Sequence, residues 1–172
     1  MPLAGESPIV FCTYGLYSGG AERQWINLAA ALWRRALPVF FVTYEPLVGA
    51  NCHYLPLLKE SGVPLLDACQ LTPPDTSSIP DDLDRLFDRL GFGTASMVLR
   101  LIVAFRFLSP ACIFSQLDEP NIFAEIATRL CGVRRYLTSF RNHNPTNSTA
   151  ARIGARVSRH GIAPGMKHCG ES

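Results

Sequence analysis

The chain has 172 residues, of which 48% are apolar and 17% are charged, and its mean hydropathy is +0.13. This length is enough for one domain with a buried core, and this composition excludes a chain that is disordered over most of its length. Sixteen Lys and Arg residues balance fourteen Asp and Glu residues. That balance argues against a nucleic-acid partner, because nucleic-acid binders carry a concentrated basic face.

The first part of the chain predicts alternating strands and helices. Short apolar runs bounded by turn residues indicate strands buried on both faces, and apolar residues recurring every three or four positions indicate helices. The predicted strands are 9–13, 39–43 and 63–66, and the predicted helices are 21–35 and 54–61. In the first helix, the residues expected to face the core are Trp25, Leu28, Ala29, Leu32 and Trp33.

The second part continues the same alternation. A loop over 71–82, rich in proline and serine, precedes an amphipathic helix through Leu83, Leu86, Phe87 and Leu90. There follow an apolar helix over 95–108, a strand over 111–115, a helix capped by Asp118 and extending through Arg129, and a strand over 135–140. Strands that alternate with helices predict an α/β fold with a Rossmann-like, doubly wound parallel sheet.

Charge and pattern divide the chain into two parts. Residues 8–145 carry the predicted sheet and helices, whereas residues 146–172 show no sustained apolar period. The last 22 residues contain four basic groups and one acidic group. We therefore expect one domain over 8–145, followed by a basic, poorly ordered tail over 146–172.

The cysteines and the N-terminus bear on the compartment. Six cysteines lie at least 17 positions apart, so they match neither a zinc motif nor a compact disulfide framework. We expect reduced cysteines, no metal and no cofactor. Residues 1–8 lack the basic and apolar regions of a signal peptide. These features predict a cytoplasmic protein; contact of Arg100 and Arg106 with the inner face of a membrane is an open alternative to a core helix.

The loops that follow parallel strands contain the candidate site residues, because ligands bind at the carboxyl ends of such strands. Gly19 and Gly20 precede the first helix, with Glu22 in its first turn. Paired glycines at a helix N-terminus let a phosphate approach free backbone N–H groups. The spacing matches neither the dinucleotide fingerprint nor the P-loop, so a tight turn is an equal alternative.

Two later loops supply polar side chains. Gln116 and Asn121 follow the fourth strand and are candidates for contact with sugar hydroxyls, although Asp118 beside them is equally suited to a helix cap. Arg141 follows the fifth strand and can bind phosphate or carboxylate through its guanidinium; a surface ion pair is the alternative. The four histidines show no catalytic spacing, and we assign no catalytic residue.

Two stretches together resemble the family four glycosyltransferases, in the N-terminal domain of their GT-B fold. The first is Gly19-Gly-Ala-Glu-Arg-Gln-Trp-Ile-Asn-Leu-Ala-Ala-Ala-Leu32 with the following strand Val39-Phe-Phe-Val-Thr43. The second contains Phe114-Ser-Gln-Leu, Ala124-Glu-Ile-Ala, Gly132-Val and Leu137-Thr-Ser-Phe-Arg-Asn142. The resemblance spans residues 8 to 145.

The resemblance implies transfer of a sugar from a nucleotide sugar to a glycan or lipid-linked acceptor, as in polysaccharide biosynthesis. In such enzymes the N-terminal domain mostly binds the acceptor, and its GGAE loop approaches the donor phosphates, here at Gly19 and Gly20. Many members have a histidine after the fourth strand, where this chain has Ser115-Gln116. Arg141 matches the family's S-x-R-N pattern.

One family feature is missing from the sequence. The family's donor domain carries two glutamates eight positions apart, and no two glutamates have that spacing here. We therefore expect a truncated chain that supplies the acceptor-side half and is inactive alone. Two alternatives remain: a non-catalytic Rossmann-like binding module, and an NAD-dependent dehydrogenase in which Glu45 binds the ribose.

Overall fold

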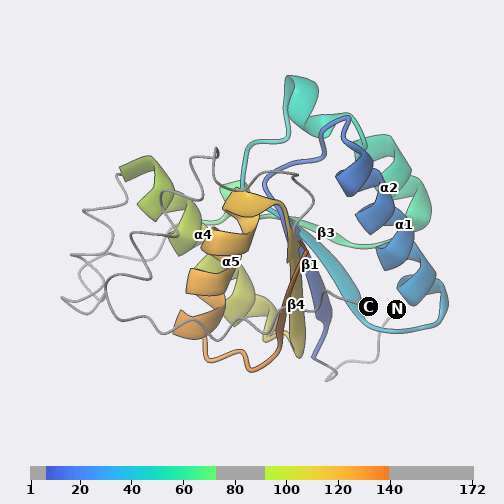
Figure 1. Ribbon diagram of the computed structural model, residues 1–172. Helices are drawn as coiled ribbons and strands as arrows, with labels where there is room; N and C mark the ends of the chain where they lie inside the picture. The colour runs from blue at the N-terminus through green and yellow to red at the C-terminus, as the bar shows by residue number, and fades with distance from the viewer. Residues whose placement is uncertain (1–6, 73–91, 140–172) are drawn as a thin grey trace, which may run out of the picture.

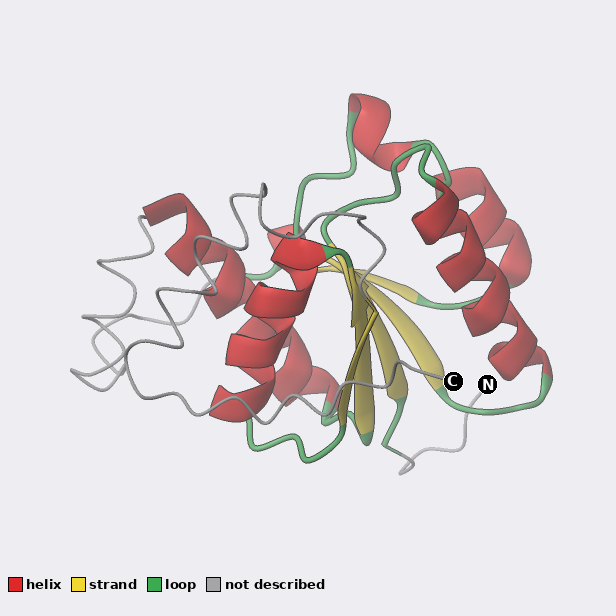
Figure 2. Ribbon diagram, viewed as in Figure 1, coloured by secondary structure: helices red, strands yellow, loops and turns green. Residues whose placement is uncertain are grey.

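The protein contains one five-stranded parallel sheet (Figures 1 and 2). A computed structural model describes residues 7–72 and 92–139. The strand order is β3-β2-β1-β4-β5. The strands are β1 (Ile9–Thr13), β2 (Val39–Thr43), β3 (Leu65–Asp67), β4 (Cys112–Gln116) and β5 (Tyr136–Ser139). The predicted α/β class with a Rossmann-like, doubly wound sheet is confirmed.

Helices cover both faces of the sheet (Figure 2). They are α1 (Gly20–Arg34), α2 (Leu55–Ser61), α4 (Phe92–Leu108) and α5 (Asp118–Leu130), with short 3-10 turns η1 (Gly49–Cys52) and η2 (Ala68–Gln70). Helices α1 and α2 pack on one face, and α4 and α5 pack on the other. Each face of every central strand is therefore buried, which explains why these strands are continuous apolar runs in the sequence.

The α1 face is built around aromatic rings. Phe11 on β1 stacks against Phe41 on β2 and Phe114 on β4, with ring centroids 6.1 and 5.2 Å apart. The indole of Trp25 on α1 meets Phe11 edge-on at 4.9 Å. These contacts join one helix to three adjacent strands, so the start of α1 is fixed relative to the carboxyl ends of β2, β1 and β4.

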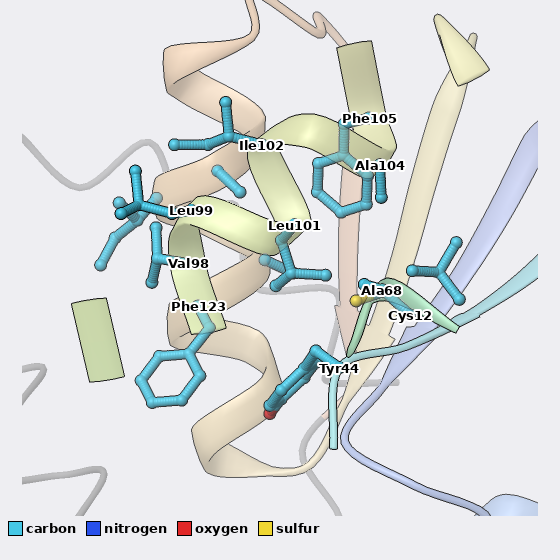
Figure 3. Packing of buried hydrophobic residues seen from close by; sticks show 14 of the residues in the cluster. Cys12, Tyr44, Ala68, Val98, Leu99, Leu101, Ile102, Ala104, Phe105 and Phe123 are labelled. Atoms are coloured by element: carbon cyan, nitrogen blue, oxygen red, sulfur yellow. The ribbon is translucent and has the colours of Figure 1, made fainter. Parts of the chain in front are cut away.

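The opposite face is packed by α4 and α5 (Figure 3). On α4 the buried side chains include Val98, Leu101, Ile102 and Phe105, so the prediction of a buried core helix is confirmed. Within the described parts of the chain, no helix has the length and apolar character needed to cross a membrane.

The structure corrects two residue assignments. Leu28 was expected to face the core but is 45% exposed. The side of α1 that faces the sheet carries Glu22, Trp25, Ile26, Ala29 and Ala30, so Ile26 is buried and Leu28 lies at the edge of this face. Asp118 was expected to cap α5, but it is the first helical residue, and the capping position is taken by Leu117. The strand β4 runs one residue further than predicted, which moves the junction with the helix.

Some element boundaries shift by a few residues. The strand β3 begins at Leu65 rather than 63, and α4 begins at Phe92 rather than 95. The helix predicted through Leu83 and Leu90 and the tail over 146–172 lie outside the described residues.

Candidate functional site

The strand order places the candidate residues at one point of the sheet. From β1 the chain moves outward through β2 to β3 and then returns to the other side of β1 to form β4 and β5. The order reverses between β1 and β4, and in open parallel sheets this reversal is where ligands bind, at the carboxyl ends of the strands. The β1–α1 loop with Gly19 and the β4–α5 junction with Gln116 lie on the two sides of this switch point.

The two glycines of the GGAE turn have different surroundings. Gly19 is the residue before α1, and a Cβ atom built on it would clash with Oε2 of Glu22. At Gly20, the first helical residue, a Cβ would meet nothing within 4 Å. Gly19 therefore makes room for the glutamate of its own turn, whereas Gly20 leaves the helix start open.

Glu22 brings a negative charge to the start of α1. Its side chain is buried, 2% exposed, and its Oε1 accepts a hydrogen bond from the Tyr14 hydroxyl at 3.3 Å. A carboxylate in the first turn is favoured by the helix dipole, which would equally favour a bound phosphate. Because Glu22 already supplies the negative charge here, a phosphate at Gly19 and Gly20 would have to approach a carboxylate.

A row of unpartnered polar groups lies in the sheet near this turn. Thr13, Thr43 and Gln116 end the three adjacent strands β1, β2 and β4, and all three side chains are buried. Thr13 lies directly opposite Thr43 in the strand register, and the alternation of the strands directs all three toward the α1 face. Within the part of the chain that the structure describes, neither threonine hydroxyl has a hydrogen-bond partner, and the same is true of both amide atoms of Gln116.

These orphaned atoms are the strongest indication of a ligand or ordered water at this end of the sheet. A buried polar atom without a partner costs about 1–3 kcal/mol, and the large majority of buried side-chain polar atoms are paired in folded proteins. The sequence identified Gln116 as a candidate. It missed Thr13 and Thr43, although both are polar residues that end apolar strands, which is the signal that would have found them.

Asn121 has a different setting from Gln116. Its Oδ1 accepts a hydrogen bond from Ser115 Oγ at 2.6 Å, and its Nδ2 donates to the backbone oxygen of Ser139 at 3.2 Å. The Tyr136 hydroxyl lies 2.7 Å from Ser115 Oγ and donates to the backbone oxygen of Asn121. The side chain of Asn121 thus joins α5 to β4 and β5, and its sugar-binding role stays a prediction.

A second set of hydrogen-bonded polar side chains lies in the loops that follow β1 and β2. The Tyr17 hydroxyl donates to Glu45 Oε2 at 2.8 Å, and Asn51 Nδ2 lies 3.3 Å from the same oxygen. Partial burial and the bond to Glu45 raise the pKa of Tyr17 to about 12. Glu45, proposed from the sequence as a ribose-binding acid, is thus engaged by two side chains of neighbouring loops.

Arg141 lies outside the described residues. Among those that are described, no group of three or more His, Cys, Asp or Glu side chains could hold a metal ion. The five described cysteines are free, and Cys169 lies outside the described ranges.

No family model matches this chain, and no curated protein matches it.

Proposed function

We propose that this chain is the acceptor-side half of a glycosyltransferase, which acts with a nucleotide-sugar donor and a glycan or lipid-linked acceptor. The proposal rests on Gln116, a buried amide at the switch point whose donor and acceptor atoms both lack partners. An amide offers one donor group and one acceptor, which suits a pair of neighbouring sugar hydroxyls. The GGAE turn and the Rossmann-like sheet agree with the family resemblance.

In this proposal each part of the site has a separate role. Gln116, with Thr13 and Thr43 at the ends of the two neighbouring strands, holds hydroxyl groups of the sugar. Gly20 leaves the backbone at the start of α1 accessible to the ligand. Asn121 and Arg141 are candidates for contact with the sugar or the donor phosphates, and Glu22 is a candidate for contact with the acceptor. The free cysteines favour a reducing compartment, so we propose a cytoplasmic location.

Calorimetry with nucleotide sugars and with oligosaccharides tests the proposal. We expect heat of binding with at least one sugar ligand, and we expect Gln116→Met to weaken it by about tenfold, because one lost hydrogen bond with an unpaired ligand hydroxyl costs on the order of 1.4 kcal/mol. Gln70→Met is the matched control, since Gln70 is exposed on η2. Binding that is equal in the two variants would contradict the role of Gln116.

A non-catalytic binding module is the second candidate, and the setting of Glu22 favours it. A buried carboxylate at the start of α1 opposes a phosphate at that position. A module that recognises a protein would give no heat with either class of sugar ligand. A module that recognises a glycan would bind oligosaccharides and no nucleotide sugar.

A further inference from the structure

The β4–α5 junction is held by hydrogen bonds that meet at Asn121. The backbone N–H of Asn121 donates to the carbonyl oxygen of Leu117 at 3.1 Å. Its side-chain Nδ2 donates to the carbonyl oxygen of Ser139 on β5 at 3.2 Å, and the backbone N–H of Leu117 donates to the same oxygen at 3.1 Å. Leu117 is therefore tied to α5 through its carbonyl group and to β5 through its amide group.

The direction of the neighbouring bonds fixes the role of the Tyr136 hydroxyl. Only a donor can face the carbonyl oxygen of Ser139, so Nδ2 of Asn121 lies there and its Oδ1 faces Ser115. Ser115 Oγ donates its single hydrogen to that Oδ1 at 2.6 Å, and it is therefore the acceptor in its 2.7 Å contact with Tyr136. The phenol hydrogen of Tyr136 is thus shared between Ser115 Oγ and the backbone oxygen of Asn121.

This network and the Gln116 amide lie on opposite faces of β4. Ser115 faces α5, which packs on one side of the sheet (Figure 1), whereas Gln116 is the next residue of the strand and points to the α1 side. Both side chains are completely buried. The sheet therefore separates the Tyr136 hydroxyl from the Gln116 amide, and the hydroxyl can act on the amide only through the backbone.

The backbone that follows Gln116 needs such support. Leu117 has φ 72° and ψ 162°, a conformation that a residue with a side chain keeps only where its surroundings hold it. If the bonds around Leu117 weaken, its φ relaxes toward negative values and the end of β4 turns with it. Gln116 lies opposite Ser139 in the register of β4 and β5. Its position therefore depends on the same two strands that the network joins.

We propose that Tyr136 is a positioning residue for Gln116. The Tyr136 hydroxyl holds Ser115 and the backbone of Asn121 together. Asn121 in turn holds Leu117 in its positive-φ conformation, and Leu117 keeps the Gln116 amide at the switch point. The positioning of Gln116 is independent of what this amide binds, whereas an effect of Tyr136 on sugar affinity rests on the proposed function.

Side-chain amide NMR of the ligand-free protein tests the positioning. The Nε2 hydrogens of Gln116 are identified by their loss in Gln116→Met, and a fixed, buried amide gives signals displaced from those of a solvated glutamine. We expect Tyr136→Phe to shift or broaden these signals, and Ser115→Ala to do the same, because each variant removes a hydroxyl of the network. Thr128→Val is the matched control and should leave the signals unchanged. It removes a buried hydroxyl that donates to the backbone of α5 near the other end of the helix.

A double-variant cycle on binding shows whether Tyr136 acts through Gln116. The probes are UDP-glucose and maltotriose, with affinities measured by calorimetry. We expect Tyr136→Phe to weaken binding by about three- to tenfold. In a Gln116→Met background the same substitution should have no effect, because the amide that it positions is gone. A merely structural role would lower the melting temperature and leave the affinity unchanged, or would lower the affinity equally in both backgrounds.

The outcomes separate the positioning role from the proposed function. Gln116 signals that are unchanged in both Tyr136→Phe and Ser115→Ala would overturn the positioning role, and so would an equal loss of affinity with and without the Gln116 amide. Displaced Gln116 signals without binding of either probe would support the positioning role and count against the proposed function.

Discussion

Gly19 and Gly20 show how neighbouring residues of one type serve different purposes. The Cα of Gly19 faces the buried carboxylate of Glu22, whereas Gly20 faces open space. The sequence is compatible with two interpretations of these glycines: a tight turn, or a turn whose backbone N–H groups a phosphate can approach. The structure gives Gly19 a local role in seating Glu22, and Gly20 is the glycine whose backbone remains accessible.

We predict that Gly19→Ala destabilises the protein by about 1–3 kcal/mol, because the new methyl group displaces a buried carboxylate from its position. Gly20→Ala is the matched control. It adds a methyl group without contacts at a helical position, and it should stabilise the protein by about 0.5–1 kcal/mol. Urea unfolding measures both free energies.

A double variant tests the cause. In a Glu22→Ala background, the cost of Gly19→Ala should disappear, since no carboxylate remains to be displaced. If Gly19→Ala costs the same in both backgrounds, the contact with Glu22 is not the reason for the glycine.

At the scale of elements, the junction of β4 with α5 is the most constrained part of the site. Leu117 has φ 72° and ψ 162°, a backbone conformation adopted almost only by glycine. The hydrogen bonds of Asn121 hold the next turn against Ser115 and Ser139. This network holds a strained residue next to Gln116, the side chain on which the proposed function rests.

We predict that Leu117→Gly is more stable than Leu117→Ala by about 1 kcal/mol. Both variants lose the leucine side chain, but only glycine relieves the positive φ, and the relief exceeds the extra entropy of glycine in the unfolded chain. Thermal or urea unfolding of the pair measures the difference. Equal stability of the two variants would show that the backbone at this position is not strained.

At the scale of the whole molecule, four tyrosines share one electrostatic property. Burial raises the pKa of Tyr14, Tyr17, Tyr44 and Tyr136, and nearby carboxylates act in the same direction. A raised pKa means that the folded chain holds the phenolic proton more tightly than the unfolded chain does. The stabilisation is therefore fully present below the unfolded pKa, about 10, and is lost as the pH rises through the folded values.

We predict that the protein loses stability above pH ~10 and unfolds as its tyrosines ionise. Absorbance of tyrosinate in the near ultraviolet should rise at a higher pH in the folded protein than in the same chain in denaturant. Tyr17→Phe should remove part of this difference, because the pKa of Tyr17 is raised to about 12. If tyrosinate absorbance rises over the same pH range in the folded and the denatured chain, the pKa values of the tyrosines are not raised by folding.

The sequence by itself determined the fold class, the strands β1 and β2, and the nature of α4, because burial between two helical layers leaves a local record as apolar runs and helical periods. It also named Gln116 as a candidate, and its role stays a prediction. It misplaced Leu28 and Asp118, because helical spacing alone does not show which side of a helix meets the sheet or where a strand stops.

Only the tertiary structure decided how the site is assembled. Tyr17 and Glu45 are 28 residues apart, and Ser115 and Tyr136 are 21 apart, yet each pair is in hydrogen-bond contact. The unpartnered state of Gln116 and Tyr44 is likewise a property of their surroundings. Such contacts depend on the strand order, which brings distant loops to one end of the sheet and leaves no local pattern in the chain.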